Sequence, residues 1–271
     1  MNEIIVLDKF PAKLDGQDVR YFMPIGGEMI ALHEWIHRHV RLEFTGRLQC
    51  MDCKKIVKKF YAPGLCYVCM QSSALNSECI INPEKCEAHL GKGKVPEWEA
   101  LHHNQPHIVY LANSGGLKVG VTRSDQIPTR WIDQGADEAI ILARTPYRQL
   151  AGQIEVALKT HLSDKTNWRI MLKNKKDSSI DMLAEKQKYA SLLYDIQSEY
   201  GDYISEDDTV YSLHYPYPAL DQTITSLKLD KQPVIEGILT GIKAQYLLFD
   251  HKNVINIRSH GGYEVAISVD S

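Results

Sequence analysis

The chain has 271 residues, of which 44% are apolar and 24% charged, as is ordinary for a soluble globular protein. Its net charge of −3 and pI near 6.4 exclude a protein that is basic over its whole surface. No window reaches the ~18 consecutive apolar residues of a membrane span, and the start, MNEIIVLDKF, lacks the pattern of a signal peptide. We therefore expect a cytoplasmic protein with reduced thiols and no membrane partner.

Apolar and turn patterns predict an α+β protein with several successive parts. The first residues are mostly extended, and the last fifty are again β-rich, which suggests a small barrel or sandwich there. A cysteine-rich stretch and a segment with both strand and helix patterns lie between them. The expected boundaries are 1–49 for an N-terminal β-rich segment, 50–104 for a metal-binding module, 105–203 for a mixed domain and 204–271 for a C-terminal β-rich domain.

All six cysteines fall within residues 50–86, and the first four form two C-x-x-C pairs separated by twelve residues. Two such pairs can fold back so that four thiolates surround one Zn²⁺. Gly64, just before the second pair, supplies the backbone freedom that a second metal-binding knuckle needs. Disulfides and a thioredoxin-like redox pair are the alternatives. We expect a structural zinc site whose ligands are Cys50, Cys53, Cys66 and Cys69.

A second, less regular group follows in the pattern Cys-x6-Cys-x2-His. A fourth ligand could come from His102, His103 or His107, and we prefer His103 because it precedes the next predicted strand. Two thiolates with two imidazoles suit Zn²⁺ as well as four thiolates do. The alternative is a pair of packed or free thiols. The predicted ligands of this second structural zinc are Cys79, Cys86, His89 and His103.

The mixed domain begins with a predicted hairpin, because the strand patterns HIVYLA and LKVGVT are joined by the turn signal NSGG. An apolar strand, AIILAR, and a helix starting near Pro146 follow. Apolar residues at helical spacing from Leu150 to Leu162 give this helix a buried face, and Glu155 lies at its edge. A longer helix is expected over 178–200. Its inward residues would be Met182, Leu183, Tyr189, Leu192, Leu193 and Ile196.

The hairpin, the turn after it and the first helix offer a phenol, two cations and a carboxylate. A phenol can take a proton from water, a guanidinium can bind two phosphoryl oxygens, and a carboxylate can hold Mg²⁺. Phosphodiester chemistry needs such a set, and eight Lys/Arg against two acids in residues 140–176 surround the carboxylate. An ordinary hairpin core is the alternative. The candidate residues are Tyr110, Lys118, Arg130 and Glu155.

Two tryptophans near these residues admit two interpretations. Trp131 and Trp168 could stack on nucleic-acid bases. They could equally close the hydrophobic core, which is the usual place of a tryptophan. The polar and aromatic stretch PTRWIDQGADEA, which contains the first of them, is interpreted as lining a site.

The segment resembles the GIY-YIG nuclease module, through Val109-Tyr110, Lys118-Val119-Gly120, Arg130, Glu155 and Asn167. The order of predicted strands and helices is similar too, and the likeness covers about a quarter of the chain. The resemblance implies a role for each residue: general base for Tyr110, phosphate binding for Arg130, Mg²⁺ or Mn²⁺ on Glu155, and bracing of the site for Asn167. Two departures stand out. The first motif reads Ile-Val-Tyr, and Lys118 replaces the second tyrosine, where it could bind phosphate instead.

The whole chain also looks similar to an uncharacterised bacterial zinc-knuckle family, through CIINPEKCEAH and HIVYLANSGGLKVGVTR followed by IPTRWIDQGA. Three functions are consistent with these residues. The first is a metal-dependent endonuclease, a hydrolase that cleaves DNA or RNA. The second is a zinc-containing DNA- or RNA-binding protein without catalysis, which the missing second tyrosine favours. The third is a zinc-stabilised interaction protein. We expect the first.

Overall fold

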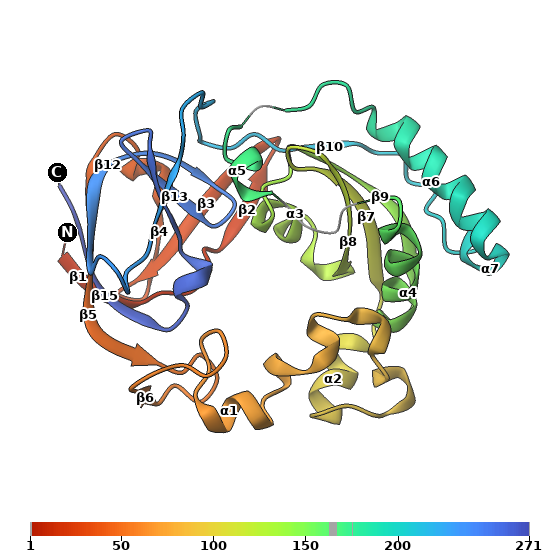
Figure 1. Cartoon of the computed structure of the whole chain (residues 1–271), viewed down its shortest axis with the longest axis horizontal. Helices are drawn as coiled ribbons and strands as arrows, with labels where there is room; N and C mark the ends of the chain where they lie inside the picture. The colour runs from red at the N-terminus through yellow and green to blue at the C-terminus, as the bar shows by residue number, and fades with distance from the viewer. Residues whose placement is uncertain (1, 163–166, 175, 271) are drawn as a thin grey trace. The chain divides into compact units, whose positions relative to one another are not determined.

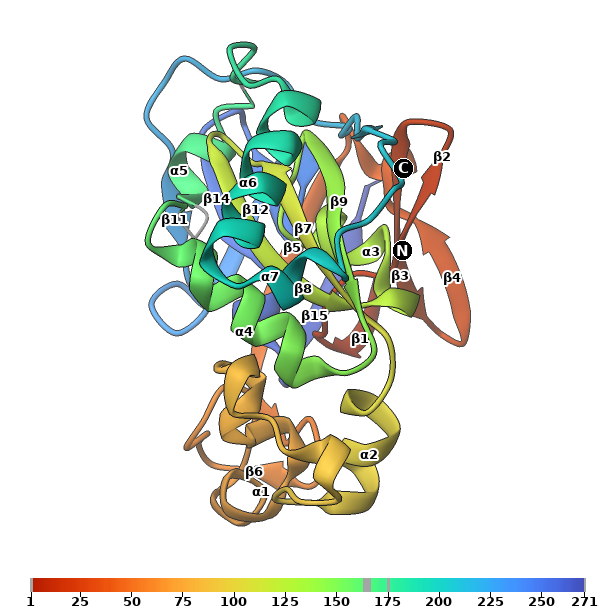
Figure 2. The same ribbon diagram turned by 90° about the vertical axis from the view of Figure 1, so that its right-hand side faces the viewer.

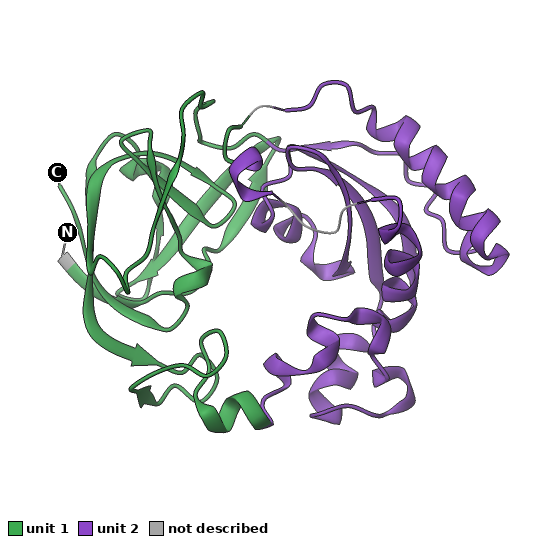
Figure 3. Ribbon diagram, viewed as in Figure 1, with its two compact units in different colours: residues 1–71, 172–174, 214–271 green, residues 72–171, 175–213 purple. Residues whose placement is uncertain are grey.

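The computed structural model describes residues 2–162, 167–174 and 176–270, and it has the predicted mixed α+β fold (Figure 1). The chain forms two compact units (Figure 3). Unit 1 comprises residues 1–71, 172–174 and 214–271, and unit 2 comprises residues 72–171 and 175–213. Within the described part of the chain, no helix combines the length and apolar character needed to cross a membrane.

Unit 1 is built on β-sheets. Its larger sheet has the strand order β1-β15-β5-β12-β13-β14-β11, with β6 paired to β5, and a three-stranded sheet has the order β2-β3-β4. The N-terminal strands are β1 (Asn2–Val6), β2 (Ala12–Asp15), β3 (Asp18–Ile25), β4 (Glu28–Ala31), β5 (His39–Gln49) and β6 (Ile56–Val57). The C-terminal strands are β11 (Thr225–Leu227), β12 (Val234–Lys243), β13 (Tyr246–Phe249), β14 (Asn253–Asn256) and β15 (Tyr263–Val269).

Strands from both ends of the chain share the larger sheet. β5 lies between β12 and β15, so that Leu42 is paired with both Ile235 and Ile267, and all three side chains are buried. The alternating pattern correctly indicates strands at both ends. It does not reveal that they pair, because the partners are far apart in the sequence and no local signal marks them. β5 ends at Gln49, directly before the first cysteine.

Unit 2 contains a four-stranded sheet with the order β10-β9-β7-β8. Helices α4 and α6 cover one face of it (Figure 2), and they bury a continuous apolar cluster against β7, β8 and β9. The strands are β7 (His107–Asn113), β8 (Leu117–Arg123), β9 (Glu138–Thr145) and β10 (Tyr211–Ser212). The helices are α2 (Pro96–His103), α3 (Thr129–Asp133), α4 (Arg148–Lys159), α5 (Trp168–Met171), α6 (Met182–Ile196) and α7 (Ser198–Gly201). A further helix, α1 (Tyr67–Ser72), spans the boundary of the two units.

The predicted hairpin is confirmed as β7 and β8. Asn113 pairs with Leu117 and Tyr110 with Gly120 across an antiparallel ladder. The turn needs its two glycines, because Gly115 and Gly116 have φ angles of 76° and 144°, which side chains rarely tolerate. The hairpin therefore places the two predicted motif strands side by side.

The two predicted helices are also present. α4 buries Leu150, Ile154 and Leu158 as expected. α6 starts at Met182 because the carboxylate of Asp181 accepts hydrogen bonds from the first turn of backbone N–H groups. The inward position predicted for Ile196 is wrong, since its side chain is 45% exposed at the last residue of the helix, beyond the packed face.

Candidate functional site

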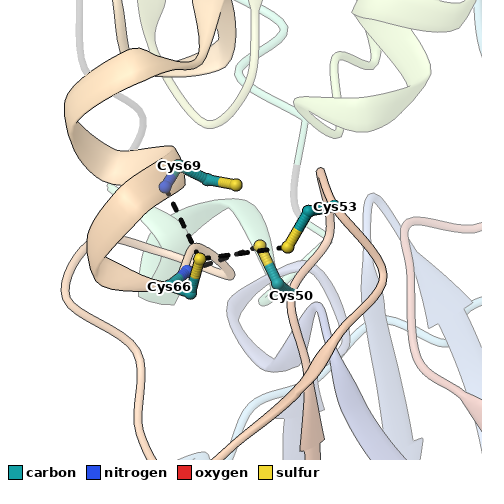
Figure 4. A group of neighbouring side chains, drawn as sticks. All are labelled: Cys50, Cys53, Cys66 and Cys69. Atoms are coloured by element: carbon teal, nitrogen blue, oxygen red, sulfur yellow. Dashed lines mark hydrogen bonds between the residues drawn. The ribbon is translucent and has the colours of Figure 1, made fainter.

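The first four cysteines come together in unit 1 (Figure 4). Cys50 follows β5, and Cys69 lies in α1. The Sγ atoms of Cys53 and Cys66 are 3.9 Å apart, close to the ~3.8 Å expected for two thiolates on a tetrahedral zinc with Zn–S bonds of ~2.3 Å. All four ligand atoms lie within 4.8 Å of one another, and all four thiols are free. The cluster could therefore hold a metal ion.

Backbone N–H groups point at the sulfurs of this cluster. The N–H of Cys66 donates to Sγ of Cys50 over 3.4 Å, and the N–H of Cys69 donates to Sγ of Cys66 over 3.5 Å. Burial raises the pKa of Cys50, but backbone donors led by Cys66 outweigh it and lower that pKa to about 6. Gly64 has a φ of 72°, which confirms the predicted tight turn before the second pair. The backbone donors therefore favour the thiolate at Cys50, the form that binds metal, whereas a hydrogen bond with Asp52 and burial raise the pKa of Cys69.

A second cluster lies in unit 2 and contains Cys79, Cys86 and His103, with the ligand atoms again within 4.8 Å of one another. Nδ1 of His103 is 3.6 Å from each of the two sulfurs. All three side chains are buried. A hydrogen bond from Cys79, opposed by burial and helped by His103, lowers the pKa of Cys86 to about 4. This cluster could hold a metal ion as well, with three ligands in place.

The other histidines named from the sequence lie in different surroundings. His89 stacks on Tyr147, with ring centroids 4.2 Å apart and planes at 7°, and it is not in the close group. Nδ1 of His107 is 2.7 Å from the carbonyl oxygen of Gln105, so Nδ1 carries the proton and Nε2 the lone pair. That Nε2 is buried and has no hydrogen-bond partner among the described residues. Burial, together with the charges of Arg148 and then His103, lowers the pKa of His107 to about 4.

A polar cavity of about 230 Å³ lies in unit 2 beside β8. Three residues predicted from the sequence reach it from three elements: Gly120 from β8, Arg130 from α3 and Glu155 from α4. The charged groups around it are three cations and one carboxylate. Its polar side chains are Arg130, Gln134, Arg148, Glu155 and Lys159, and Ile80, Ile81 and Pro83 contribute to its wall.

Tyr110 lies directly behind Gly120 and is fully buried. A Cβ on Gly120 would be 2.5 Å from the tyrosine hydroxyl, so only glycine leaves room for the ring. The hydroxyl donates to Oε1 of Gln134 over 2.7 Å. Burial raises the pKa of Tyr110, while the charge of Arg130 acts to lower it. Gln134 thus connects the phenol to the cavity.

The charged side chains of the cavity are only partly paired. Nε of Arg130 is buried and has no hydrogen-bond partner within the described residues. The side chain of Glu155 is 10% exposed, and its Oε2 is 3.4 Å from Nζ of Lys159, one helical turn further on. A guanidinium with an unused donor and a paired carboxylate therefore face the same space.

The other predicted residues do not line the cavity. Lys118 is 3% exposed on β8, where burial and then the charge of Arg130 lower its pKa to about 7. Asn167 is exposed, and its Oδ1 accepts hydrogen bonds from the N–H groups of Arg169 and Ile170 at the start of α5. Trp131 is fully buried against Tyr110, so it closes the core and is not available to stack on a base.

Sequence reasoning missed two cations of the cavity, Arg148 and Lys159, whereas Gln134 lies in the stretch PTRWIDQGADEA that was interpreted as lining a site. The two cations lie on α4, seven residues before and four residues after Glu155. These are the spacings of one helix face, so both could have been predicted from the position of the glutamate. The guanidinium of Arg148 donates through Nε and Nη2 to the carbonyl of Cys79, over 3.0 and 2.9 Å. Burial lowers the pKa of Arg148, and the charges of Cys79 and Cys86 act to raise it.

A family model matches residues 37–265, and the chain therefore belongs to that family, which is described as "Protein of unknown function (DUF2797)". Comparisons with curated proteins and with solved structures found no match. The family description assigns no activity, so a functional argument depends on the residues and their geometry.

Proposed function

We propose that the cavity of unit 2 binds and cleaves a phosphodiester of DNA or RNA, while zinc in the two cysteine clusters stabilises the fold. One observation carries the proposal. Gly120, Arg130 and Glu155, which the GIY-YIG resemblance singles out from the sequence, line the same cavity, with Tyr110 packed directly behind Gly120. Their convergence from three separate elements supports a shared role.

The charges of the cavity suit a phosphate group. Three cations surround one carboxylate, which leaves an excess of positive charge for an anion. Nε of Arg130 is a buried donor without a partner in the described chain. A phosphodiester oxygen would satisfy such a donor, because a guanidinium can bind two phosphoryl oxygens at once. Arg130 would then stabilise the negative charge that builds on the phosphate during cleavage.

Cleavage would use the remaining residues as the resemblance implies. A water oxygen would form a bond to phosphorus while its proton passes to the phenolate of Tyr110. The bond from phosphorus to the leaving oxygen would break with its electron pair, and the leaving alkoxide would take a proton, from Tyr110 or from water. Glu155 would hold Mg²⁺ or Mn²⁺, which would supply positive charge near the phosphate. Breaking its ion pair with Lys159, at 3.4 Å, would free the carboxylate for the cation and the ammonium for the substrate.

Zinc in the clusters would be structural. The first cluster already offers four thiolates, and a closed set of four protein ligands leaves no position for a substrate. In the second cluster the three gathered ligands are buried, which also disfavours access by a nucleic acid. The chemistry is therefore assigned to the cavity.

A second function, nucleic-acid binding without cleavage, is favoured by the state of Tyr110. Its hydroxyl is buried, and burial raises its pKa, which favours the neutral phenol over the phenolate base. Lys118 stands where the module has its second tyrosine and is buried too. A cavity with these properties can bind phosphate without activating water.

Cleavage and binding should be measured on the same variants. Labelled single-stranded and duplex DNA and RNA are incubated with the wild type, Arg130→Gln and Glu155→Gln in Mg²⁺ or Mn²⁺, and binding is measured without divalent cation. For the enzyme we expect Glu155→Gln to abolish cleavage and keep binding, and Arg130→Gln to weaken both. Val156→Ala, an exposed position next to Glu155, is the matched control.

The outcomes separate the two functions. Metal-dependent cleavage that Glu155→Gln removes supports the nuclease. Binding without cleavage, weakened by Arg130→Gln and by salt, supports the second function. A wild type that neither cleaves nor binds any of these nucleic acids would rule out both and leave a zinc-stabilised interaction protein.

A further inference from the structure

We propose that metal binding at Cys79, Cys86 and His103 controls the affinity of the unit 2 cavity for phosphate, with Arg148 as the residue that connects the two. The inference rests on the proposed function, because it assumes that the cavity binds a phosphodiester. It adds an anion-binding residue and a control that neither the sequence motifs nor the family supplies.

The loop between the two cysteines forms part of the cavity wall. Ile80, Ile81 and Pro83 line the cavity, while Cys79 and Cys86 mark the two ends of the loop and meet in the metal cluster. The only regular structure in this loop consists of two short 3₁₀ turns, Glu78–Ile80 and Pro83–Lys85. A metal ion bound by both cysteines would close this loop at its base.

Arg148 is fixed by the same loop. Its Nε and Nη2 donate to the carbonyl oxygen of Cys79, over 3.0 and 2.9 Å, and Nη2 also lies 3.2 Å from the carbonyl oxygen of Ile80. The guanidinium also lines the cavity. Its orientation therefore depends on where the backbone of a metal ligand lies, and a displaced Cys79 would release it.

Gly152 ties the loop to the helix that carries Glu155. A Cβ on Gly152 would overlap the backbone N of Glu84 and the carbonyl carbon of Pro83, and would lie 2.7 Å from Cβ of Pro83. The loop thus rests directly on the backbone of α4. Arg148, Gly152, Glu155 and Lys159 recur at helical spacing, so one face of α4 meets both the loop and the cavity.

Loss of the metal would act on the cavity through these contacts. Without it, the ends of the loop would be joined by the contacts among Cys79, Cys86 and His103 and by an exposed ion pair between Lys85 and Glu78. The wall would loosen, and Arg148 would lose the acceptors that orient it. Because coupling between two binding sites is reciprocal, phosphate in the cavity would also tighten metal binding.

The test is a double-mutant cycle on the full-length, zinc-loaded protein. The probe is a short fluorescein-labelled single-stranded DNA, with binding measured by anisotropy without Mg²⁺ or Mn²⁺ so that it stays intact. The variants are Cys86→Ala, Arg148→Gln and the double variant, with zinc content measured for each. Cys69→Ala is the matched control, because it removes a zinc ligand of the other cluster, in unit 1.

We expect Cys86→Ala to lose one zinc and to bind the DNA at least about tenfold more weakly, within the usual range of coupling between sites. Arg148→Gln should keep its zinc and weaken binding similarly. The double variant should bind DNA no more weakly than the single variant with the lower affinity, because the two changes remove the same contact. Cys69→Ala should lose one zinc and stay within about twofold of the wild type.

Three results would overturn the inference. One is a folded Cys86→Ala that lacks one zinc and binds DNA like the wild type. Another is a double variant whose loss of DNA affinity equals the product of the two single losses, which would show that Arg148 and the metal act on binding independently. The third is an equal loss of affinity in Cys69→Ala.

Should Cys86→Ala fail to fold, Arg148→Gln with full affinity would refute the role of Arg148. If Arg130→Gln weakens binding while Cys86→Ala does not, the proposed function stands and only this inference fails; a wild type that does not bind removes both.

Discussion

The two cysteine clusters differ in how they are built and in what lies beside them. The first uses two regularly spaced C-x-x-C pairs, and one of its cysteines, Cys53, is exposed. The second uses irregularly spaced, buried ligands, and the loop between Cys79 and Cys86 packs on α4 and lines the cavity. The regular cluster is the easier to recognise from sequence. The irregular one is the cluster joined to the candidate site.

Removing one ligand from each cluster should produce the largest effects and should separate the two. Cys69→Ala and Cys86→Ala should each lose one zinc and several kcal/mol of stability, since the binding free energy of structural zinc contributes directly to folding. Hydrogen exchange should rise in residues 50–69 for the first variant, and in residues 79–86 and α4 for the second. The same exchange pattern in both variants would contradict the claim that only the second cluster is joined to α4.

The fourth ligand of the second cluster can be assigned by comparing two histidines. His107, like His89, lies outside the close group, but its buried Nε2 lone pair has no partner in the described chain, so we expect His107→Ala to weaken zinc binding at this cluster by about 100-fold. His89→Ala should have little effect on zinc, since that ring stacks on Tyr147. Competition with a chromophoric chelator measures both. The opposite ranking would restore His89 as the ligand, as the sequence pattern predicts.

Gly152→Ala should destabilise the protein, by about 1–3 kcal/mol, because the added methyl group would overlap the backbone of the metal loop. Helix propensity alone predicts the opposite sign, since alanine is favoured over glycine in a helix by about 1 kcal/mol. Urea unfolding of the zinc-loaded protein gives the sign directly. A stabilised variant would show that the loop does not rest tightly on α4.

The smallest expected difference is kinetic. A chelator should remove zinc from the first cluster about tenfold faster than from the second, because Cys53 is exposed whereas Cys79, Cys86 and His103 are all buried. Zinc release can be followed with a metal-sensitive dye, and Cys69→Ala identifies which phase belongs to which cluster. Equal release rates would mean that burial does not protect the second cluster.

Patterns of residues that are close along the chain predicted much of the local structure. The strand patterns HIVYLA and LKVGVT with the Asn-Ser-Gly-Gly turn predicted the hairpin of β7 and β8, and helical spacing predicted the buried face of α4. The spacing of the first four cysteines predicted a cluster that the structure brings together. These features are visible in sequence because each depends on residues that are close along the chain.

Features that depend on distant residues were not predictable. No local signal joins β5 to β12 and β15, and none places the loop of Cys79 against Gly152. The hydrogen bonds of Arg148 to the carbonyl of Cys79 were not predictable either, because a backbone carbonyl acceptor leaves no trace in the identity of the side chains. Asn167 matched the nuclease motif, yet it lies at the start of α5, outside the cavity lining.

The zinc content of the purified full-length protein tests the central claim most directly, because both clusters and the coupling to the cavity depend on it. Element analysis after exhaustive dialysis should give about two zinc ions per chain, and about one in Cys86→Ala. One zinc ion in the wild type that Cys86→Ala retains would contradict the second site, and with it the control of the cavity. No zinc at all would contradict both sites.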